Sequence, residues 1–208
     1  DVICIAISKK GTGEVLSELS SIQSDDKKMI FDISTFKKGL MEKYRDFPVN
    51  VRVASVHPMF GEGIESIEDK NVIVVPVEGR EDDSDDVIEL FENLKANVNR
   101  MNVQKHDEMM KVIIGIPYFY GVSYLNLISR YEDIEEYGGT SFEYMSVYGK
   151  AVLNDSSEFI KEVIENSEDM IEGYFKDLKV EDLDIEKLKD KYNEEIKENY
   201  SRFYTALR

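Results

Sequence analysis

Only two histidines occur among the 208 residues, so any chemistry by an imidazole depends on His57 or His106. His57 lies in the segment Ser55-Val56-His57-Pro58-Met59-Phe60-Gly61, just after a stretch that predicts a β-strand over residues 49–56. Proline at position 58 biases His57 toward an extended backbone. Ligands of open α/β sheets bind beyond the carboxyl ends of strands, so His57 is the better candidate for a catalytic base. A histidine in a structural turn is the alternative.

A second polar segment, Asp32-Ile33-Ser34-Thr35-Phe36-Lys37, follows an apolar stretch at residues 29–31. It supplies two hydroxyl groups and a cation, and it would share the crevice with His57 if the two strands are neighbours. Ser or Thr followed by Lys is also common where a helix begins, so the segment alone decides nothing. For His106-Asp107, at the start of a long apolar helix, we favour a structural role, with Asp107 as a helix cap.

The order of the predicted elements supplies a framework for these residues. Residues 2–7 form a continuous apolar run typical of a strand buried on both faces, and Gly11-Thr12-Gly13 predicts the turn into a helix. Further strands are predicted at residues 29–31, 49–56, 72–77 and 101–103, with helical spacing in between. Strands that alternate with helices predict an open parallel sheet.

The second half of the chain has a different pattern. Apolar residues at helical spacing predict helices that begin near Met109, Phe142, Glu158 and Ile185, with no strand among them. Pro117 lies inside the first of these helices and should kink it. The sequence therefore predicts an α/β domain over residues 1–104 and an all-helical domain over residues 105–208.

Composition narrows the possible functions. The chain has 26 Lys and Arg against 43 Asp and Glu, a net charge of −17, which argues against nucleic acid or an anionic membrane as the main partner. Cys4 is the only cysteine, so an intrachain disulfide and a Cys-based zinc site are excluded, and a reducing cytoplasm is expected. The acidic run at residues 81–86 spreads over several helix faces, so we interpret it as a solvated helix start and predict no metal site.

Together, three motifs resemble those of prephenate dehydrogenase: Asp-x-x-Ser/Thr-x-Lys at residues 32–37, His-Pro-Met-Phe-Gly at residues 57–61 and His-Asp-x-x-Met at residues 106–110. The resemblance covers most of residues 1–178 and is most specific at residues 55–61. It implies oxidative decarboxylation of prephenate to 4-hydroxyphenylpyruvate with NAD or NADP, on the route to tyrosine. It also implies a partial Rossmann-like sheet followed by a helical dimerisation domain.

The resemblance assigns roles to residues of the first domain. His57 would take the proton of the ring hydroxyl as hydride leaves, a role that suits a neutral imidazole. Thr35 would orient the substrate and His57 beside the nicotinamide, with Ser34 next to it in the substrate site. Ile7 and Ser8, together with Thr35, would lie against the cofactor.

Two residues of the second domain stand where the family has other types. Lys150 takes the position of an Arg that grips a substrate carboxylate, and a Lys lacks the bidentate geometry of a guanidinium group. Tyr118 takes the position of a His that some members carry beside the proline, and it could still donate one hydrogen bond. Without the resemblance, we would interpret Lys150 as a solvent-facing cation.

The Gly-x-Gly-x-x-Gly loop that holds a dinucleotide pyrophosphate is absent from the 208 residues. Under the resemblance, residues 1–104 therefore correspond to the C-terminal half of a nucleotide-binding domain. The chain alone should bind the cofactor poorly, and the strand at residues 2–7 should form an exposed sheet edge.

Several alternatives stay open. The chain could be a non-catalytic relative that senses an aromatic ligand or binds a protein, or an arogenate dehydrogenase. A 3-hydroxy-acid dehydrogenase is a weaker alternative because of the segment at residues 57–61. Eight Met and 22 Tyr and Phe exceed what a small helical core needs, which favours a homodimer over a monomeric bundle.

Overall fold

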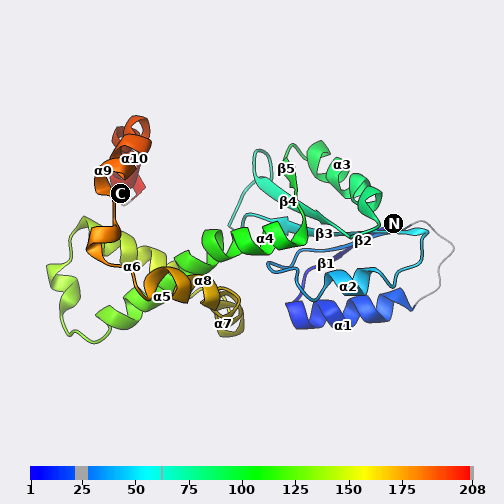
Figure 1. Ribbon diagram of the computed structural model, residues 1–208, viewed down its shortest axis with the longest axis horizontal. Coiled ribbons are helices and arrows are strands. Elements are labelled where there is room, and N and C mark those ends of the chain that lie inside the picture. Colours follow the sequence, from blue (N-terminus) through cyan, green and yellow to red (C-terminus); the bar gives the residue numbers. More distant parts are fainter. Residues whose placement is uncertain (22–27, 62, 207–208) are drawn as a thin grey trace. The chain divides into compact units, whose positions relative to one another are not determined.

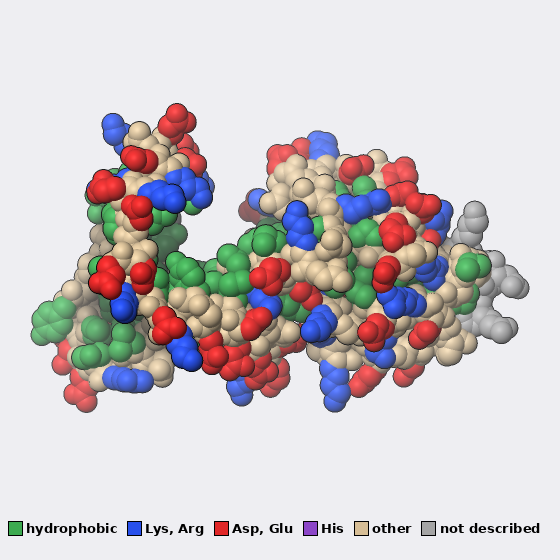
Figure 2. Space-filling view, in the orientation of Figure 1, with side chains coloured by type: hydrophobic (Ala, Val, Ile, Leu, Met, Phe, Trp, Pro, Cys, Tyr) green, Lys and Arg blue, Asp and Glu red, His purple; other side chains and the backbone are tan. Residues whose placement is uncertain are grey.

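The structure is a computed structural model that describes residues 1–21, 28–61 and 63–206 (Figure 1). The chain divides into two compact units, Asp1–Met110 and Lys111–Arg208. This boundary lies beyond the predicted one at residue 104, because His106 is fully buried and bonded to His57 within the first unit. Acidic side chains are spread over both units on the face drawn in Figure 2, as the net charge of −17 requires.

The first unit is built on a five-stranded sheet with the order β1-β2-β3-β4-β5. The strands are β1 (Val2–Ile5), β2 (Lys28–Asp32), β3 (Val51–Pro58), β4 (Asn71–Pro76) and β5 (Asn97–Arg100). Strands β1, β2 and β3 run parallel, and β4 and β5 run parallel to each other. The predicted fold class, a partial Rossmann-like sheet followed by helices, is confirmed.

The prediction of an all-parallel sheet is wrong at one pairing. Strand β4 runs antiparallel to β3, with His57 opposite Ile73. A crossover between parallel strands must carry the chain back to the opposite end of the sheet, usually through a helix. Antiparallel neighbours can be joined without a crossover, because one strand ends where the next begins. No helix occurs among the described residues between β3 and β4, so the chain returns directly. The last strand, β5, also lies a few residues earlier than the predicted strand at 101–103.

Helices cover both faces of the sheet, as Figure 1 shows. Helices α1 (Lys9–Ser20) and α2 (Met41–Tyr44) lie on one face, and α3 (Asp85–Asn93), which follows a 3-10 turn at Glu81–Ser84, lies on the other. Successive strand residues point to opposite faces, so Ile30 packs on the α1 side and Phe31 on the α3 side. Two apolar cores therefore hold the sheet between its helices.

Two predictions about the start of the chain are wrong. Gly11-Thr12-Gly13 is not a turn, since it lies within α1, where a Cβ on Gly13 would approach the side chain of Lys43 to 3.3 Å. The strand at the start is not buried on both faces either. Strand β1 is instead an exposed edge of the sheet in the described chain, as the absence of a glycine-rich half predicted, and only Ile5 in it is buried.

The second unit is helical, as predicted. It contains α5 (Ile116–Ile128), α6 (Thr140–Val152), α7 (Ser157–Glu165), α8 (Glu168–Phe175), α9 (Ile185–Lys191) and α10 (Asn193–Ala206), with 3-10 turns at Ile134–Tyr137 and Val180–Asp182. Helices α5 and α6 approach closely at two glycines, because a Cβ on Gly149 would lie 2.8 Å from the carbonyl oxygen of Gly121. The long helix predicted from Glu158 is broken between α7 and α8, where the side chains of Asn166 and Ser167 donate to carbonyl groups of the preceding turn.

Residues Val103–Ile128 form a continuous helical run of α4 (Val103–Met110), a π-helical turn (Lys111–Gly115) and α5. The π-helical turn directly precedes Pro117, whose ring cannot fit a regular α-helical interior. This run is long and apolar enough to cross a membrane, by length and composition only, whereas the sequence predicted no apolar run of that length. Its first turns carry the buried His106 and its later part packs on α6, but only 11% of its most apolar stretch is buried.

Candidate active site

The carboxyl end of β2 carries a buried polar cluster centred on Asp32. One oxygen, Oδ2, accepts hydrogen bonds from the hydroxyl groups of Tyr44 (2.7 Å) and Ser55. The other oxygen, Oδ1, accepts from the backbone N–H of Ser34 (2.8 Å) and from Nζ of Lys37 (3.4 Å). The side chains of Asp32 and Lys37 are both 0% exposed, so each needs the other to keep its charge inside the protein.

The charges of this cluster follow from its contacts. Burial acts to raise the pKa of Asp32, but the ammonium group of Lys37 and the donated hydrogen bonds outweigh it, so the pKa lies below its ordinary value. Burial lowers the pKa of Lys37, and Asp32 opposes that effect. Burial, and then the charge of Asp32, raise the pKa of Tyr44 well above its ordinary value. Tyr44 therefore stays a neutral donor to an ionised Asp32.

Lys37 links this cluster to the next strand. Its Nζ donates a hydrogen bond to the carbonyl oxygen of Val56 at 2.6 Å, one residue before His57. The structure places His57 inside β3, near its end, rather than in the following loop. Because β2 and β3 are parallel, Asp32 and His57 occupy the same edge of the sheet, as the sequence predicted.

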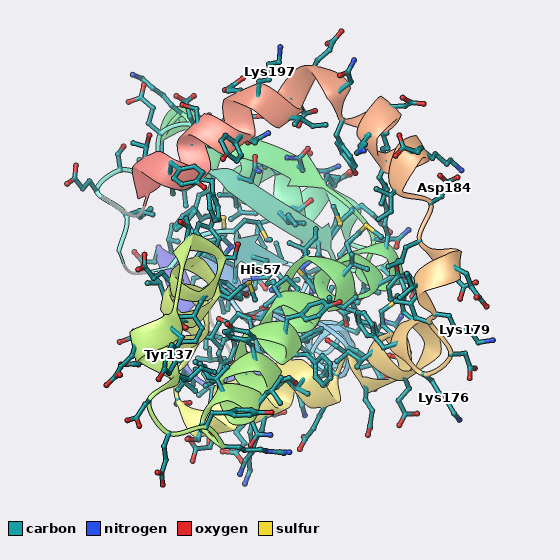
Figure 3. All side chains as sticks on the ribbon, turned by 90° about the vertical axis from the view of Figure 1, so that its left-hand side faces the viewer. His57, Tyr137, Lys176, Lys179, Asp184 and Lys197 are labelled. Atoms are coloured by element: carbon teal, nitrogen blue, oxygen red, sulfur yellow. The ribbon has the colours of Figure 1, made fainter. Side chains whose placement is uncertain are left out.

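His57 is joined to His106 and Asp107 by a chain of hydrogen bonds. Nδ1 of His57 lies 3.1 Å from Nε2 of His106, and Nδ1 of His106 lies 2.8 Å from Oδ1 of Asp107. His57 is 5% exposed and His106 is 0% exposed. Figure 3 labels His57 at the end of β3. The two histidines of the sequence therefore form one buried pair.

Asp107 also anchors the segment that follows β2. Its Oδ1 accepts the backbone N–H of Lys37 at 3.0 Å, and its Oδ2 accepts the backbone N–H of Lys38 at 2.9 Å. The prediction that Asp107 caps its own helix is therefore wrong, because it lies inside α4 and binds another segment. Burial acts to raise the pKa of Asp107, but the hydrogen bonds from His106 and from the two backbone groups outweigh it, and the pKa is lowered.

The surroundings of His57 keep it neutral. Burial is the main cause, with the charge of Lys37 and the neighbouring His106 next, and together they lower the pKa of His57 to about 3. A neutral imidazole has a lone pair that can accept a proton. The arrangement therefore holds a neutral hydrogen-bond acceptor in one orientation, and the low pKa makes this ring a weak base in the unliganded protein.

The other residues predicted for the first unit lie at the same edge. Ser34 is buried, and its hydroxyl group donates to Oγ1 of Thr12 at 3.5 Å. Thr35 is partly exposed, and no side-chain hydrogen bond of Thr35 occurs within the described ranges. Ile7 is 52% exposed, and Ser8 is exposed with its Oγ accepting the backbone N–H of Gly11.

These positions bear on the cofactor that the resemblance implies. Ile7 and Ser8 follow β1, and Thr35 follows the parallel strand β2, so all three lie near one edge and are open to a ligand. The sequence has no glycine-rich loop for a pyrophosphate, and Oγ of Ser8 already bonds within α1. The residues of this chain therefore fit the nicotinamide end of a dinucleotide and not its pyrophosphate.

The two predicted residues of the second unit have partners there. Nζ of Lys150 lies 3.2 Å from Oε1 of Glu135, and both side chains are exposed. The hydroxyl group of Tyr118 donates to Oδ2 of Asp155 at 2.5 Å, and burial together with this hydrogen bond raises the pKa of Tyr118 above its ordinary value. The donor of Tyr118 is thus occupied in this structure, and the substrate-binding roles of both residues stay predictions.

Sequence reasoning missed two members of the site, His106 and Asp107. They were interpreted as structural because they open a long apolar helix that Asp107 could cap, and their separation of 49 positions from His57 gave no reason to pair them with it. One signal was available: a chain with only two histidines places an Asp directly after the second of them. A carboxylate beside an imidazole is a common way to orient the ring, and it would have justified pairing the two histidines.

Comparison with known protein families decides the relationship. Residues 1–100 match the profile of the prephenate dehydrogenase nucleotide-binding domain. Residues 1–100 are a nucleotide-binding domain of the prephenate dehydrogenase family. This is a family of NAD-dependent dehydrogenases, which agrees with the resemblance of the three sequence motifs. A search of curated proteins finds no match to the chain.

Solved structures agree on the fold of the family. The prephenate dehydrogenase of A. aeolicus, in complex with hydroxyphenyl propionate and NAD+, is similar with a TM-score of 0.72 at 19% identity, and the match covers 99% of this chain and 76% of that one. The arogenate dehydrogenase of Synechocystis is similar with a TM-score of 0.65 at 12% identity, covering 99% of this chain and 75% of that one. At these identities the likeness shows the fold alone.

Proposed function

We propose that this protein takes part in the oxidative decarboxylation of prephenate to 4-hydroxyphenylpyruvate with NAD or NADP as oxidant. The observation that carries the proposal is the neutral, buried His57 at the carboxyl end of β3, bonded to His106 and next to the Asp32–Lys37 pair. The match of residues 1–100 to the prephenate dehydrogenase nucleotide-binding domain supports it. In the solved relative from A. aeolicus, a hydroxyphenyl compound and NAD+ are bound together.

In this reaction His57 acts as the proton acceptor. A bound nicotinamide nucleotide supplies the acceptor for the hydride that leaves the ring carbon. The imidazole of His57 hydrogen-bonds the hydroxyl group on that carbon and takes its proton, so that a carbonyl can form there. The ring carboxylate then leaves as CO2, and its bonding electron pair makes the ring aromatic with the oxygen as a phenol. Burial and, after it, the positive charge of Lys37 lower the pKa of His57 and keep the ring neutral before the reaction.

The segment after β2 positions the reactants. Thr35 has a partly exposed side chain beside the buried Ser34, so its hydroxyl group is free to contact the substrate and the nicotinamide ring. Ile7 and Ser8 offer an exposed surface at the next strand end for the same ring. We further propose that the pyrophosphate is held by a glycine-rich loop that is not among these 208 residues, so that the chain alone binds the nucleotide weakly.

The helical unit is proposed to form a homodimer. It exposes many large apolar side chains, which on a soluble protein usually mark an interface. Those of the last two helices follow one stripe: Leu188 in α9, then Ile196, Tyr200 and Tyr204 in α10. We retain the cytoplasm as the proposed location, since the chain has a single cysteine, Cys4.

A second candidate is arogenate as substrate, which differs from prephenate only in its side chain. This alternative is supported by the shared fold of the arogenate dehydrogenase of Synechocystis. Lys150 does not discriminate between the two substrates, because both carry the carboxylates that a cation at this position would bind. A non-catalytic sensor of an aromatic ligand would have the same fold and would not form NADH.

The test is NADH or NADPH formation with prephenate and with arogenate, each supplied with NAD+ or NADP+ at saturating concentration. The proposal predicts reduction of the nucleotide with prephenate, and loss of about 100-fold or more in the His57→Asn variant, the scale typical of a general base. Reduction with arogenate alone would favour the second candidate. Calorimetric binding of prephenate and nucleotide without any reduction would contradict both dehydrogenase assignments.

A further inference from the structure

The two ring nitrogens of His57 are not equivalent, because Nδ1 faces His106 whereas Nε2 makes no hydrogen bond within the described ranges. We infer that His106 and Asp107 are positioning residues that fix the tautomer of His57, with the proton on Nδ1 and an open lone pair on Nε2. The inference names the atom that accepts the substrate proton. Its catalytic consequence rests on the proposed function, whereas the tautomer itself does not.

The assignment starts at Asp107. Its carboxylate accepts the backbone N–H groups of Lys37 and Lys38 and faces Nδ1 of His106 at 2.8 Å. Backbone amides can only donate, so at both oxygens Asp107 must act as an acceptor. These hydrogen bonds favour the ionised carboxylate, and the lowered pKa of Asp107 agrees with that state.

The state of His106 follows from that of Asp107. A carboxylate oxygen 2.8 Å away requires a proton on Nδ1 of His106, since two acceptors at that distance would repel each other. If the ring of His106 is neutral it carries only this one proton, and Nε2 of His106 is then an acceptor. His106 is fully buried, so this acceptor has no access to water and needs a donor from the protein.

His57 supplies that donor. Its Nδ1 lies 3.1 Å from Nε2 of His106, within hydrogen-bond distance, and must therefore carry the proton. Neutral His57 then has its lone pair on Nε2, on the side of the ring away from His106. The opposite tautomer would place two lone pairs against each other in a buried site, at the cost of an unsatisfied hydrogen bond.

Asp107 also positions the segment that carries Thr35. The same carboxylate binds the N–H groups of Lys37 and Lys38. Asp107 therefore fixes the backbone of residues 32–38 and, through His106, the orientation of the His57 ring. During the reaction, the proton taken by Nε2 leaves His57 as an imidazolium that still donates from Nδ1 to His106. The negative charge of Asp107 stabilises that cation through His106.

Nitrogen NMR of the two histidines tests the tautomer directly. In a long-range proton–nitrogen correlation spectrum of protein labelled at histidine, the chemical shifts of Nδ1 and Nε2 show which nitrogen carries the proton. The chain has only His57 and His106, so His106→Gln leaves a single ring and assigns the signals. We expect Nδ1–H on both rings in the unliganded protein at neutral pH. A proton on Nε2 of His57 would overturn the inference.

Variants at His106 separate positioning from packing. The amide oxygen of Gln can occupy the place of Nε2 and accept from His57, whereas Leu fills a similar volume without an acceptor. We expect His106→Gln to keep the Nδ1–H tautomer of His57 and His106→Leu to lose it, giving a mixture. An unchanged tautomer in a folded His106→Leu variant would contradict the assignment.

Asp107→Asn has a matched control in Asp46→Asn, since Asp46 is exposed and lies outside the hydrogen-bonded chain. Asp107→Asn should shift the tautomer of His57, and Asp46→Asn should not. In a nucleotide-reduction assay, His106→Leu should lower kcat about 10-fold to 100-fold with little change in KM, and His106→Gln should restore most of it. If neither the wild-type protein nor any variant reduces the nucleotide, but NMR shows the Nδ1–H tautomer of His57, the proposed function is wrong and the tautomer assignment stands.

Discussion

Replacing His57 by Asn should remove a pH dependence of folding stability that the structure assigns to this one ring. The pKa of His57 is lowered to about 3 in the folded protein, whereas an unfolded chain has the ordinary value of about 6.5. As the pH falls below 6.5, the unfolded state takes up a proton that the folded state does not, so the free energy of unfolding decreases. The amide of Asn can still donate to His106 but does not titrate.

The size of this effect follows from the two pKa values. At about pH 5, the proton uptake of the unfolded chain destabilises wild type by about 2 kcal/mol relative to the variant, and at about pH 7.5 the contribution is close to zero. Asp32 and Asp107 have lowered pKa values and titrate below this range, so they leave the difference intact. The acidic chain also keeps its negative net charge above about pH 5.

Urea unfolding followed by circular dichroism measures the difference, with wild type and His57→Asn compared at each pH. The stability of wild type relative to the variant should rise by about 2 kcal/mol from pH 5 to pH 7.5. A difference that does not change with pH would show that His57 ionises normally in the folded protein. Its burial beside Lys37 and His106 would then not govern its charge.

Three further predictions concern the framework. Asp32→Asn leaves a buried ammonium group without its counterion and should destabilise the protein by about 3–5 kcal/mol in thermal unfolding, whereas Asp85→Asn, in an exposed pair, should cost at most about 1 kcal/mol. Gly115→Ala places a Cβ 1.9 Å from Oγ of Ser167 and should lower the free energy of unfolding by about 1–3 kcal/mol, and Ser167→Gly should partly restore it. The control Gly173→Ala has open space around its Cβ and should not lower the free energy of unfolding. Light scattering should give twice the 24.0 kDa of one chain if the proposed homodimer forms, and 24.0 kDa would exclude it.

The sequence was sufficient to predict the placement of Asp32 and His57 at one edge of a sheet. Both residues end apolar strands of the β-α-β type, and parallel neighbours bring their carboxyl ends together. The antiparallel pairing of β3 and β4 was not predictable from strand propensity, because a β-branched run has the same pattern whichever way the strand runs. The glycines at Gly11 and Gly13 were misleading for a related reason, since close packing and a turn both favour a residue without a side chain.

The hydrogen-bonded chain from His57 to Asp107 depends on tertiary contacts that no local pattern encodes. His106 lies 49 residues after His57, and only folding of α4 against the sheet brings the rings to 3.1 Å. The anchoring of the Lys37 and Lys38 backbone by Asp107 is equally non-local, because backbone N–H groups have no sequence signature. The His-Asp-x-x-Met motif at residues 106–110 located these residues but did not reveal their partners.

The proposed function requires that Nε2 of His57 accept a hydrogen bond from the hydroxyl group of a hydroxycyclohexadiene substrate. Titration of histidine-labelled protein with prephenate, in the absence of nucleotide, tests it most directly. The Nε2 resonance of His57 should move toward the shift of a nitrogen that accepts a hydrogen bond, in proportion to the prephenate bound by calorimetry, while Nδ1 keeps its proton. Saturation with prephenate that leaves the Nε2 resonance of His57 unchanged would contradict the claim.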